Sequence, residues 1–138
     1  MRQIEFFVAG EPKAQPRPRA FVRGGRARVY DPGTAEGWKG QVALAARDHL
    51  PFKPIDLAVA VHLRFHMPRP RGHYGRAGLK ASAPEHHVGK PDVDNLAKAV
   101  LDALVAIGFL QDDRFVRSLL VTKRYANTAP GCDVRLTW

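Results

Sequence analysis

The sequence predicts an α+β fold: a single domain, residues 1–138, with a mixed β-sheet of about four to six strands covered by two main helices. Several short segments alternate apolar and polar side chains, as strands with one buried face do. Two longer segments repeat apolar residues at the spacing of a helix. Paired strands outnumber strand–helix–strand units along the chain, which favours a mixed sheet over an all-parallel one.

The first three predicted strands lie close to the N-terminus. Residues 3–8 (QIEFFV) alternate, and residues 20–23 and 26–30 are expected to form a hairpin that turns at Gly24–Gly25. The segment between the first strand and the hairpin is rich in proline, which enforces an extended, non-helical backbone. The residues that share the apolar face of the first strand are Ile4, Phe6 and Val8.

A helix and the clearest strand of the chain follow. Asp31–Pro32 is a helix-start signal, because an aspartate N-cap accepts backbone N–H groups and proline suits the first helical position. The helix should extend to about His49, and residues 57–65 (LAVAVHLRF) should form the next strand. The predicted buried residues are Trp38, Val42 and Ala45 in the helix, and Leu57, Val59, Val61, Leu63 and Phe65 in the strand.

The second predicted helix begins at Asn95, with Asp94 as its N-cap, and ends at Gly108. Residues 115–125 then form a long strand, and residues 134–138 form a short final one. Apolar residues outside the main stripe of this helix predict that it packs against more than one neighbour. The stripe consists of Leu96, Val100, Ala103 and Ile107, and the further apolar residues are Leu101 and Val105.

Composition and charge narrow the class of partner. The chain carries 22 basic and 13 acidic residues, which gives a formal net charge of +9. Such a charge favours a polyanion, nucleic acid first and an anionic membrane surface second. The apolar runs are too short to cross a bilayer and the N-terminus lacks a secretory signal, so we expect a cytoplasmic protein with no membrane partner. The single cysteine, Cys132, excludes an intramolecular disulfide and a cysteine-based zinc site.

The basic residues gather in a proline- and glycine-rich stretch before the first helix. Six cations fall within residues 13–28, and the aromatics Phe21 and Tyr30 accompany them. This pattern predicts contact with a phosphate backbone, and a solvated linker is the alternative. The cations are Lys13, Arg17, Arg19, Arg23, Arg26 and Arg28.

The acidic residues concentrate in residues 90–113, which hold five of the thirteen. Asp92 and Asp94 flank Val93 in an extended segment, so their side chains can point the same way. Helical spacing places Asp94, Lys98 and Asp102 in one row, because residues four apart lie on one face. Asp112 and Asp113 begin the following strand, and a strand beside the helix could return one of them to the first pair.

Carboxylates brought together in this way favour a bound metal ion. Two carboxylates about 5 Å apart repel each other by roughly 3 kcal/mol at an effective dielectric constant near 20. Three of them either take up protons or bind a cation, and oxygen ligands select Mg²⁺ or Mn²⁺ over zinc. The alternative is that the acids only cap a helix and form a solvated turn.

Residues 66–90 form the longest irregular stretch of the sequence, rich in proline, glycine and histidine. Long loops of compact domains are usually functional or disordered. A segment that contacts DNA and becomes ordered on binding is the favoured interpretation here. The adjacent His86 and His87 lack the spacing of zinc ligands, so we do not expect a metal site at these residues.

The order of these motifs resembles that of the RusA family of Holliday-junction resolvases over nearly the whole chain. The resemblance includes PKAQPRPR after the first strand, HMPRPRGHYG after the middle strand, and SAPEHH leading to KPDVDN. It continues through LAKAVLDAL and QDDRFV to the strand that ends in KRY. The combination KPDVDNLxKxxLDAL followed by DD is long and specific, far more so than an isolated DxD.

The resemblance implies roles for individual residues. Asp92, Asp94 and Asp113 match the family's three metal-binding catalytic aspartates, and Lys98 matches its essential lysine. The matching N-terminal segment implies DNA-binding roles for Lys13, Arg17 and Arg19, and Lys90 beside the PDxDN motif is expected to join them.

The same resemblance implies a Mg²⁺-dependent enzyme, with Mn²⁺ as a substitute and no small-molecule cofactor. The family acts as a homodimer on four-way DNA junctions, and it occurs in bacteria and their phages. We therefore expect a structure-specific endonuclease that resolves Holliday junctions by paired symmetric cleavage. The alternative is a basic protein that binds branched DNA without catalysis.

Overall fold

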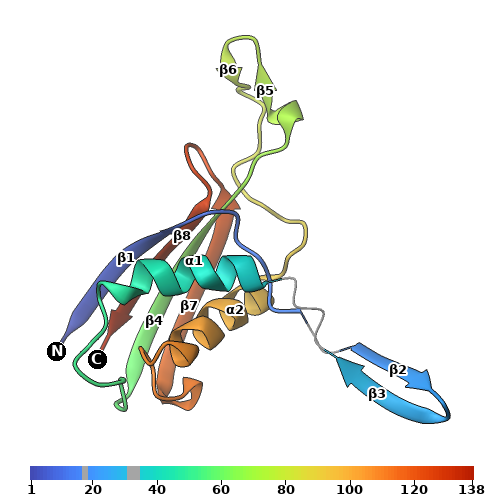
Figure 1. Ribbon diagram of the computed structural model, residues 1–138. Helices are drawn as coiled ribbons and strands as arrows, with labels where there is room; N and C mark the ends of the chain where they lie inside the picture. The colour runs from blue at the N-terminus through green and yellow to red at the C-terminus, as the bar shows by residue number, and fades with distance from the viewer. Residues whose placement is uncertain (17–18, 31–34) are drawn as a thin grey trace.

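The computed structural model describes residues 1–16, 19–30 and 35–138. Its centre is a four-stranded sheet in the order β1–β8–β4–β7 (Figure 1). The parallel pairing of β4 with β7 and the antiparallel pairing of β8 with both β1 and β4 make the sheet mixed, as predicted. The four strands are β1 (Gln3–Ala9), β4 (Val59–Met67), β7 (Val116–Tyr125) and β8 (Gly131–Thr137).

Alternation along the strands separates a buried face of the sheet from a polar one. In β4 the odd-numbered side chains are buried, while its even-numbered side chains are half-buried or exposed. The strand begins at Val59, so the prediction for Leu57 was wrong: this side chain is 61 % exposed. On the polar face, His66 Nε2 lies 2.8 Å from Asp133 Oδ2, and an arginine nitrogen of Arg135 lies 2.8 Å from His62 Nδ1.

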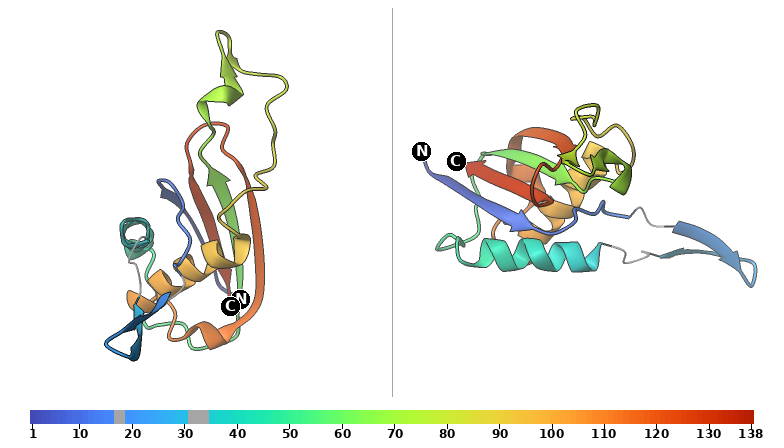
Figure 2. Two further views of the ribbon diagram at one scale, coloured as in Figure 1. Left: turned by 90° about the vertical axis from the view of Figure 1, so that its right-hand side faces the viewer. Right: turned by 90° about the horizontal axis from the view of Figure 1, so that it is seen from above.

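Both helices lie on the same side of the sheet (Figure 2). The first, α1 (Glu36–Arg47), has Ala35 at its N-cap, so its start was predicted too early. Asp31 and Pro32, the predicted start signal, lie outside the described residues. The buried stripe of α1 also differs at one position from the prediction. Trp38, Val42 and Ala46 follow each other at intervals of four and are buried, whereas Ala45 is only partly buried at the edge of this stripe.

The second helix, α2 (Val93–Ala106), packs against both the sheet and α1. Leu96, Val100 and Ala103 are buried as predicted, and Leu101 is buried too, which confirms that α2 has more than one neighbour. Ile107 follows the last helical residue and is only partly buried.

The start of α2 corrects one prediction. Asp92, in an extended conformation, occupies the N-cap, and no side-chain hydrogen bond caps the helix. Asp94 was predicted to be this cap and instead lies in the first turn. A negative charge there is still favourable, because the N-terminal end of a helix carries a partial positive charge.

The end of α2 fixes where the chain goes next. Gly108 has a φ of +80°, a left-handed conformation that side chains other than glycine rarely adopt. The N–H of Phe109 donates to the carbonyl of Leu104 at 2.9 Å, and the N–H of Gly108 donates to that of Val105 at 3.1 Å. This is the Schellman arrangement, and it confirms Gly108 as the predicted end of the helix. A short 3₁₀ helix, η2 (Asp113–Phe115), then leads into β7.

Two small hairpins lie outside the main sheet. The predicted hairpin is confirmed as β2 (Arg19–Arg23) and β3 (Arg26–Tyr30), with Gly24 and Gly25 both at positive φ in the turn. Residues 66–90, which were predicted to be irregular, contain a second hairpin. After β4 the chain forms the 3₁₀ helix η1 (Arg71–His73) and the strands β5 (Tyr74–Gly75) and β6 (Gly78–Leu79), which extend away from the sheet (Figure 1).

The remaining sequence predictions concern Cys132 and membrane spans. Cys132 is fully buried between β1 and β4, and burial raises the pKa of its thiol, which keeps it protonated and unreactive. Among the described residues, no helix has the length and apolar character needed to cross a bilayer.

Alanine in place of one glycine of α1 and of one glycine of β8 should change the stability of the fold in opposite directions. Gly40 lies inside α1 with open space at its Cβ position, so Gly40→Ala should stabilise the fold by about 0.5–1 kcal/mol. Gly131 pairs with Ala9, and a Cβ there would collide with the carbonyl oxygen of Val8 and the ring of Phe7. Gly131→Ala should therefore destabilise it. Urea unfolding of the two variants measures both changes, and equal effects would contradict this packing.

Candidate active site

One face of α2 carries a row of charged side chains. Asp94, Lys98 and Asp102 are spaced by four residues, so successive members are about 40° apart around the helix axis and about 6 Å apart along it. The Lys98 ammonium lies 2.8 Å from Asp102 Oδ1. Most other residues of α2 are buried, and beyond this row only its ends and Val105 are partly open to solvent, so the charged side chains of the helix meet solvent along this row.

The second acidic cluster lies beside this row. Asp113, at the start of η2, places Oδ2 at 3.5 Å from Lys98 Nζ. The hydrogen bond to Asp102 raises the pKa of Lys98, and the charges of Asp102 and Asp113 add to this effect against a smaller opposing contribution from burial. The structure thus brings Asp113 to Lys98, on the face of α2 that also carries Asp102. The sequence expectation was a return of Asp112 or Asp113 to Asp92 and Asp94, and this closer meeting of the carboxylates stays a prediction.

Asp112 has a different role from its neighbour. Its carboxylate accepts a hydrogen bond of 2.8 Å from the backbone N–H of Arg114 and so caps η2. This backbone hydrogen bond lowers the pKa of Asp112, which keeps it ionised. Asp112 therefore stabilises the short helix that presents Asp113.

Asp92 is presented by a loop that β7 holds in place. The ammonium of Lys123 donates to the carbonyl oxygens of Gly89 and Pro91, the latter at 2.8 Å. Sequence reasoning missed Lys123. The sequence feature that could have identified it is its place in the predicted strand. Lys123 pairs with Phe65 of β4, so this cation lies on the side of the sheet that the helices cover.

The acidic residues suit a hard metal ion by their chemistry. All are carboxylates, and oxygen ligands are those that Mg²⁺ and Mn²⁺ prefer. Among the described residues, however, no three His, Cys, Asp or Glu side chains are gathered closely enough to hold an ion. Asp113 Oδ2 pairs with the ammonium of Lys98, so the carboxylate oxygens attract positive charge but do not form a preassembled metal centre among the described residues.

Basic side chains lie next to the start of α2. The backbone N–H of Gln15 donates to the carbonyl of Asn95 at 3.0 Å, which attaches the proline-rich segment to the first turn of the helix. Lys13 and Lys90 line one pocket of about 330 Å³, which also includes Pro91, the residue before Asp92. Two of the four predicted DNA-binding cations therefore lie together at a pocket that reaches the residue before Asp92.

The other two predicted cations are described only in part. Arg17 lies outside the described residues, and for Arg19 the structure describes the backbone in β2 and not the side chain. Lys13 is half-exposed, and its ammonium is 3.1 Å from Glu11 Oε1. An exposed pair of this kind contributes little to stability, so a phosphate can compete for Lys13.

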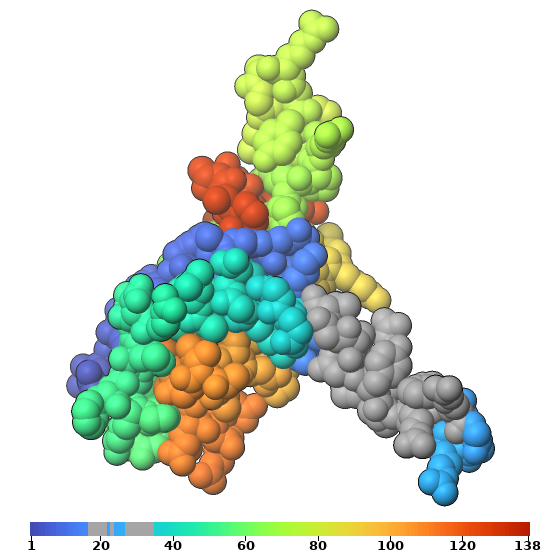
Figure 3. Space-filling view, in the orientation of Figure 1, coloured from blue at the N-terminus to red at the C-terminus, as the bar shows by residue number. Residues whose placement is uncertain are grey.

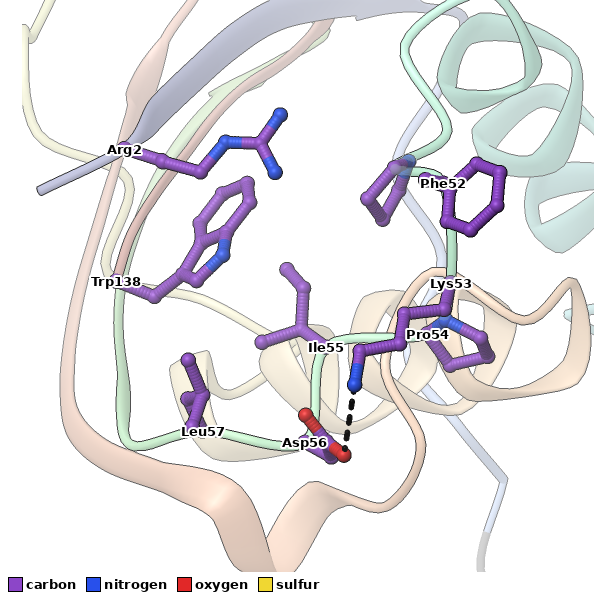
Figure 4. A pocket seen from close by; sticks show the side chains of 9 residues that line it. Arg2, Phe52, Lys53, Pro54, Ile55, Asp56, Leu57 and Trp138 are labelled. Atoms are coloured by element: carbon purple, nitrogen blue, oxygen red, sulfur yellow. Dashed lines mark ion pairs between the residues drawn. The ribbon is translucent and has the colours of Figure 1, made fainter.

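A more enclosed pocket lies elsewhere, where the two chain termini meet (Figure 4). Its walls are mainly apolar, with Trp138 beneath the guanidinium of Arg2, and its one acid, Asp56, is 3.6 Å from Lys53. None of the predicted catalytic residues line it. The open acidic face of α2 therefore remains the candidate active site, and an open face can accept a substrate as wide as duplex DNA.

Comparison with known proteins gives a consistent result. The family model of endodeoxyribonuclease RusA matches residues 9–137. The uncharacterized protein YqaN of Bacillus subtilis (strain 168) is 36 % identical over 126 residues, which cover 89 % of this chain and 88 % of that protein. The crossover junction endodeoxyribonuclease RusA of Aquifex aeolicus (strain VF5) is 18 % identical over 136 residues, which cover 99 % of this chain and 92 % of that protein.

The contacts of Lys123 predict a local loss of order in a variant. Lys123→Met leaves the carbonyls of Gly89 and Pro91 without their charged donor, which should cost about 2 kcal/mol. Backbone amides of residues 85–92 should then exchange hydrogen faster, whereas those of β1 should not. Lys80→Met, at an exposed position, is the matched control. Unchanged exchange at residues 85–92 would show that Lys123 does not fix this loop.

Proposed function

Because the chain belongs to the RusA endodeoxyribonuclease family, we propose that it is a Mg²⁺-dependent endonuclease that resolves Holliday junctions by paired symmetric cleavage. The observation that carries the proposal is the 3.5 Å approach of Asp113 to Lys98. This contact places one member of the second acidic cluster of the sequence beside the charged face of α2. The Aquifex relative is a crossover junction endodeoxyribonuclease, which supports the choice of substrate.

In this proposal Asp92, Asp94 and Asp113 hold the metal ion. When bound, Mg²⁺ supplies an activated water and neutralises charge on the scissile phosphate. Among the described residues these carboxylates are not gathered in a group of three, and Asp113 contacts Lys98, so a bound ion would have to draw them together. Mn²⁺ can take the same place, because it shares the preference for oxygen ligands.

Lys98 has two proposed tasks. Its raised pKa keeps it charged throughout the physiological range, and the 2.8 Å contact with Asp102 holds its ammonium on the charged face of α2. An ammonium in this position stabilises the negative charge that develops on the phosphate or the leaving oxygen during cleavage. Asp102 therefore acts through Lys98 and not on the substrate.

DNA binding is assigned to cations around the same face. Lys13 and Lys90 share a pocket beside Pro91, and Arg17 and Arg19 follow Lys13 in the sequence. Phosphate contacts by these side chains position the duplex without selecting its sequence. A homodimer would supply two such sites related by a two-fold axis, which matches the approximate two-fold symmetry of a four-way junction.

A second candidate function is binding of branched DNA without cleavage. It is favoured by the absence of a gathered metal cluster among the described residues and by the pairing of Asp113 with a lysine. In a protein that only binds DNA, these aspartates would serve only to order the start of α2 and of η2. Dependence of cleavage on both Mg²⁺ and the three aspartates separates the two functions.

Cleavage of a labelled four-way junction tests the proposal. The protein with Mg²⁺ should cut two opposed strands, and EDTA should abolish cutting. Asp92→Asn, Asp94→Asn and Asp113→Asn should each lower the rate more than about a hundredfold while junction binding persists. Asp48→Asn, an exposed change at the end of α1, should cut normally. Cutting that survives all three substitutions would refute the site, and no cutting by the parent protein would favour the binding-only function.

Binding measured in EDTA over a range of salt concentrations tests the basic pocket. Each phosphate contact releases condensed counterions, so Lys13→Ala and Lys90→Ala should each reduce the slope of log affinity against log salt by about 1. The loss should be similar for junction and linear duplex. Lys53→Ala is the control, because Lys53 pairs with Asp56 at the pocket of Figure 4. A slope unchanged by both pocket variants would exclude these lysines as phosphate ligands.

A further inference from the structure

Residues 68–84, called here the arm, extend from the end of β4 and return towards α2. They contain η1 and the β5–β6 hairpin and stand clear of the sheet and helices in the space-filling view (Figure 3). The hairpin pairs Tyr74 with Leu79 and turns before Gly78, which has a φ of +105°. The sequence predicted a segment that becomes ordered only on binding, whereas here the arm has regular structure in the free chain.

The base of the arm is fixed to the body through Arg69. Its guanidinium donates to the backbone carbonyls of Ala126 at 2.9 Å and Pro84 at 2.6 Å, and to Asn127 Oδ1 at 3.1 Å. It also lies 5.3 Å from the centre of the Tyr125 ring. Arg69 thus ties both legs of the arm to the end of β7, which sets the direction in which the arm extends.

Tyr125 adds further contacts, one with the outgoing leg of the arm and two with the residues that follow the arm. The rings of His73 and His87 meet its ring edge-on, at centroid distances of 4.8 and 5.0 Å. Its backbone N–H donates to the carbonyl of Glu85 at 2.9 Å. The base of the arm is therefore held by side chains from the same strand end that supplies Lys123.

The outer part of the arm is basic and carries exposed apolar surface. The arm contains four cations and no acid over seventeen residues. Among the described residues, no carboxylate pairs with Arg71, Arg76 or Lys80. Tyr74 and Leu79, opposite each other in the hairpin, are 45 % and 46 % exposed. An exposed aromatic–aliphatic pair surrounded by unpaired cations is suited to nucleic acid, with bases against the apolar pair and phosphates at the cations.

The arm also adjoins the candidate active site. Pro68, at its start, lines the same pocket as Lys13 and Lys90, and His87, three residues after its end, lines it too. Burial lowers the pKa of His87, and the nearby charge of Lys123 lowers it further, so this wall of the pocket is neutral at pH 7. DNA held at the lysines of this pocket would continue along the arm.

We propose that the arm contacts the branch point of a DNA junction, where Tyr74 and Leu79 pack against exposed base faces and the arm's cations hold the adjoining phosphates. This rests on the proposed function only in that branched DNA is the substrate. Base faces are accessible at a branch point but are hidden by stacking inside a linear duplex. The apolar pair therefore favours branched over linear DNA, whereas the cations favour both equally.

Equilibrium binding of the full chain in EDTA, to a four-way junction and to a linear duplex of the same sequence, tests this inference. Tyr74→Ala should weaken junction binding about tenfold and leave duplex binding nearly unchanged, because stacking is lost only where base faces are open. Tyr74→Phe should retain junction binding, since the ring is kept. Phe52→Ala, which removes a fully exposed aromatic at the pocket of Figure 4, should change neither affinity.

Arg69→Ala tests the fixed base of the arm. With unfolding measured in parallel, this variant should lose as much junction binding as Tyr74→Ala, although Arg69 itself need not touch DNA. Junction binding unchanged by Arg69→Ala would overturn its role in directing the arm. An equal loss of junction and duplex binding in Tyr74→Ala, or no loss, would overturn branch-point contact.

The two proposals fail separately. Junction preference that depends on Tyr74 in a protein that does not cut would refute the nuclease and leave the arm's role intact. Mg²⁺-dependent cutting, combined with a preference for junction over duplex that Tyr74→Ala does not change, would support the nuclease and refute the arm's role.

Discussion

Burial of α2 against both the sheet and α1 is the constraint on which the site depends. Because most of its circumference is packed, the charged side chains can reach solvent only along one narrow row. Lys98 and Asp102 pair within that row, and the segment after α2 returns to it. The helix terminates sharply at Gly108, which lets the chain turn back and start η2 beside the helix it has just left.

The electrostatics of the molecule combine a local acidic row with an overall excess of positive charge. A carboxylate cluster inside a chain of net charge +9 would attract cations of the protein itself, and Lys98 is such a cation. In our proposal, Lys13 and Lys90 would attract a polyanion to the pocket that reaches the residue before Asp92. This arrangement favours close approach of a phosphate backbone to carboxylates that would otherwise repel it.

The end of β7 links several features that are distant in sequence. Tyr125 contacts the arm through His73 and the loop through His87, and Lys123, two residues earlier, holds the carbonyls before Asp92. In our proposals, the direction of the arm and the position of the first catalytic aspartate are therefore set by two residues on one face of the same strand, Lys123 and Tyr125. A parallel strand paired along its full length with β4 gives both a rigid support.

The sequence by itself determined the elements whose causes are local. Alternation located β4, helical spacing located α2, and the two adjacent glycines located the β2–β3 turn, because these patterns depend on the period of one element. Its errors also had local causes. Asp94 has the chemistry of an N-cap but lies two residues inside the helix, and the prolines of the arm suggested irregular structure where β5 and β6 pair.

Only the tertiary structure decided that Asp113 lies beside Lys98, that Lys13 and Lys90 share a pocket, and that Arg69 fixes the arm. Each of these contacts joins segments whose proximity is set by how the helices and strands pack, which the periodicity of a single segment does not specify.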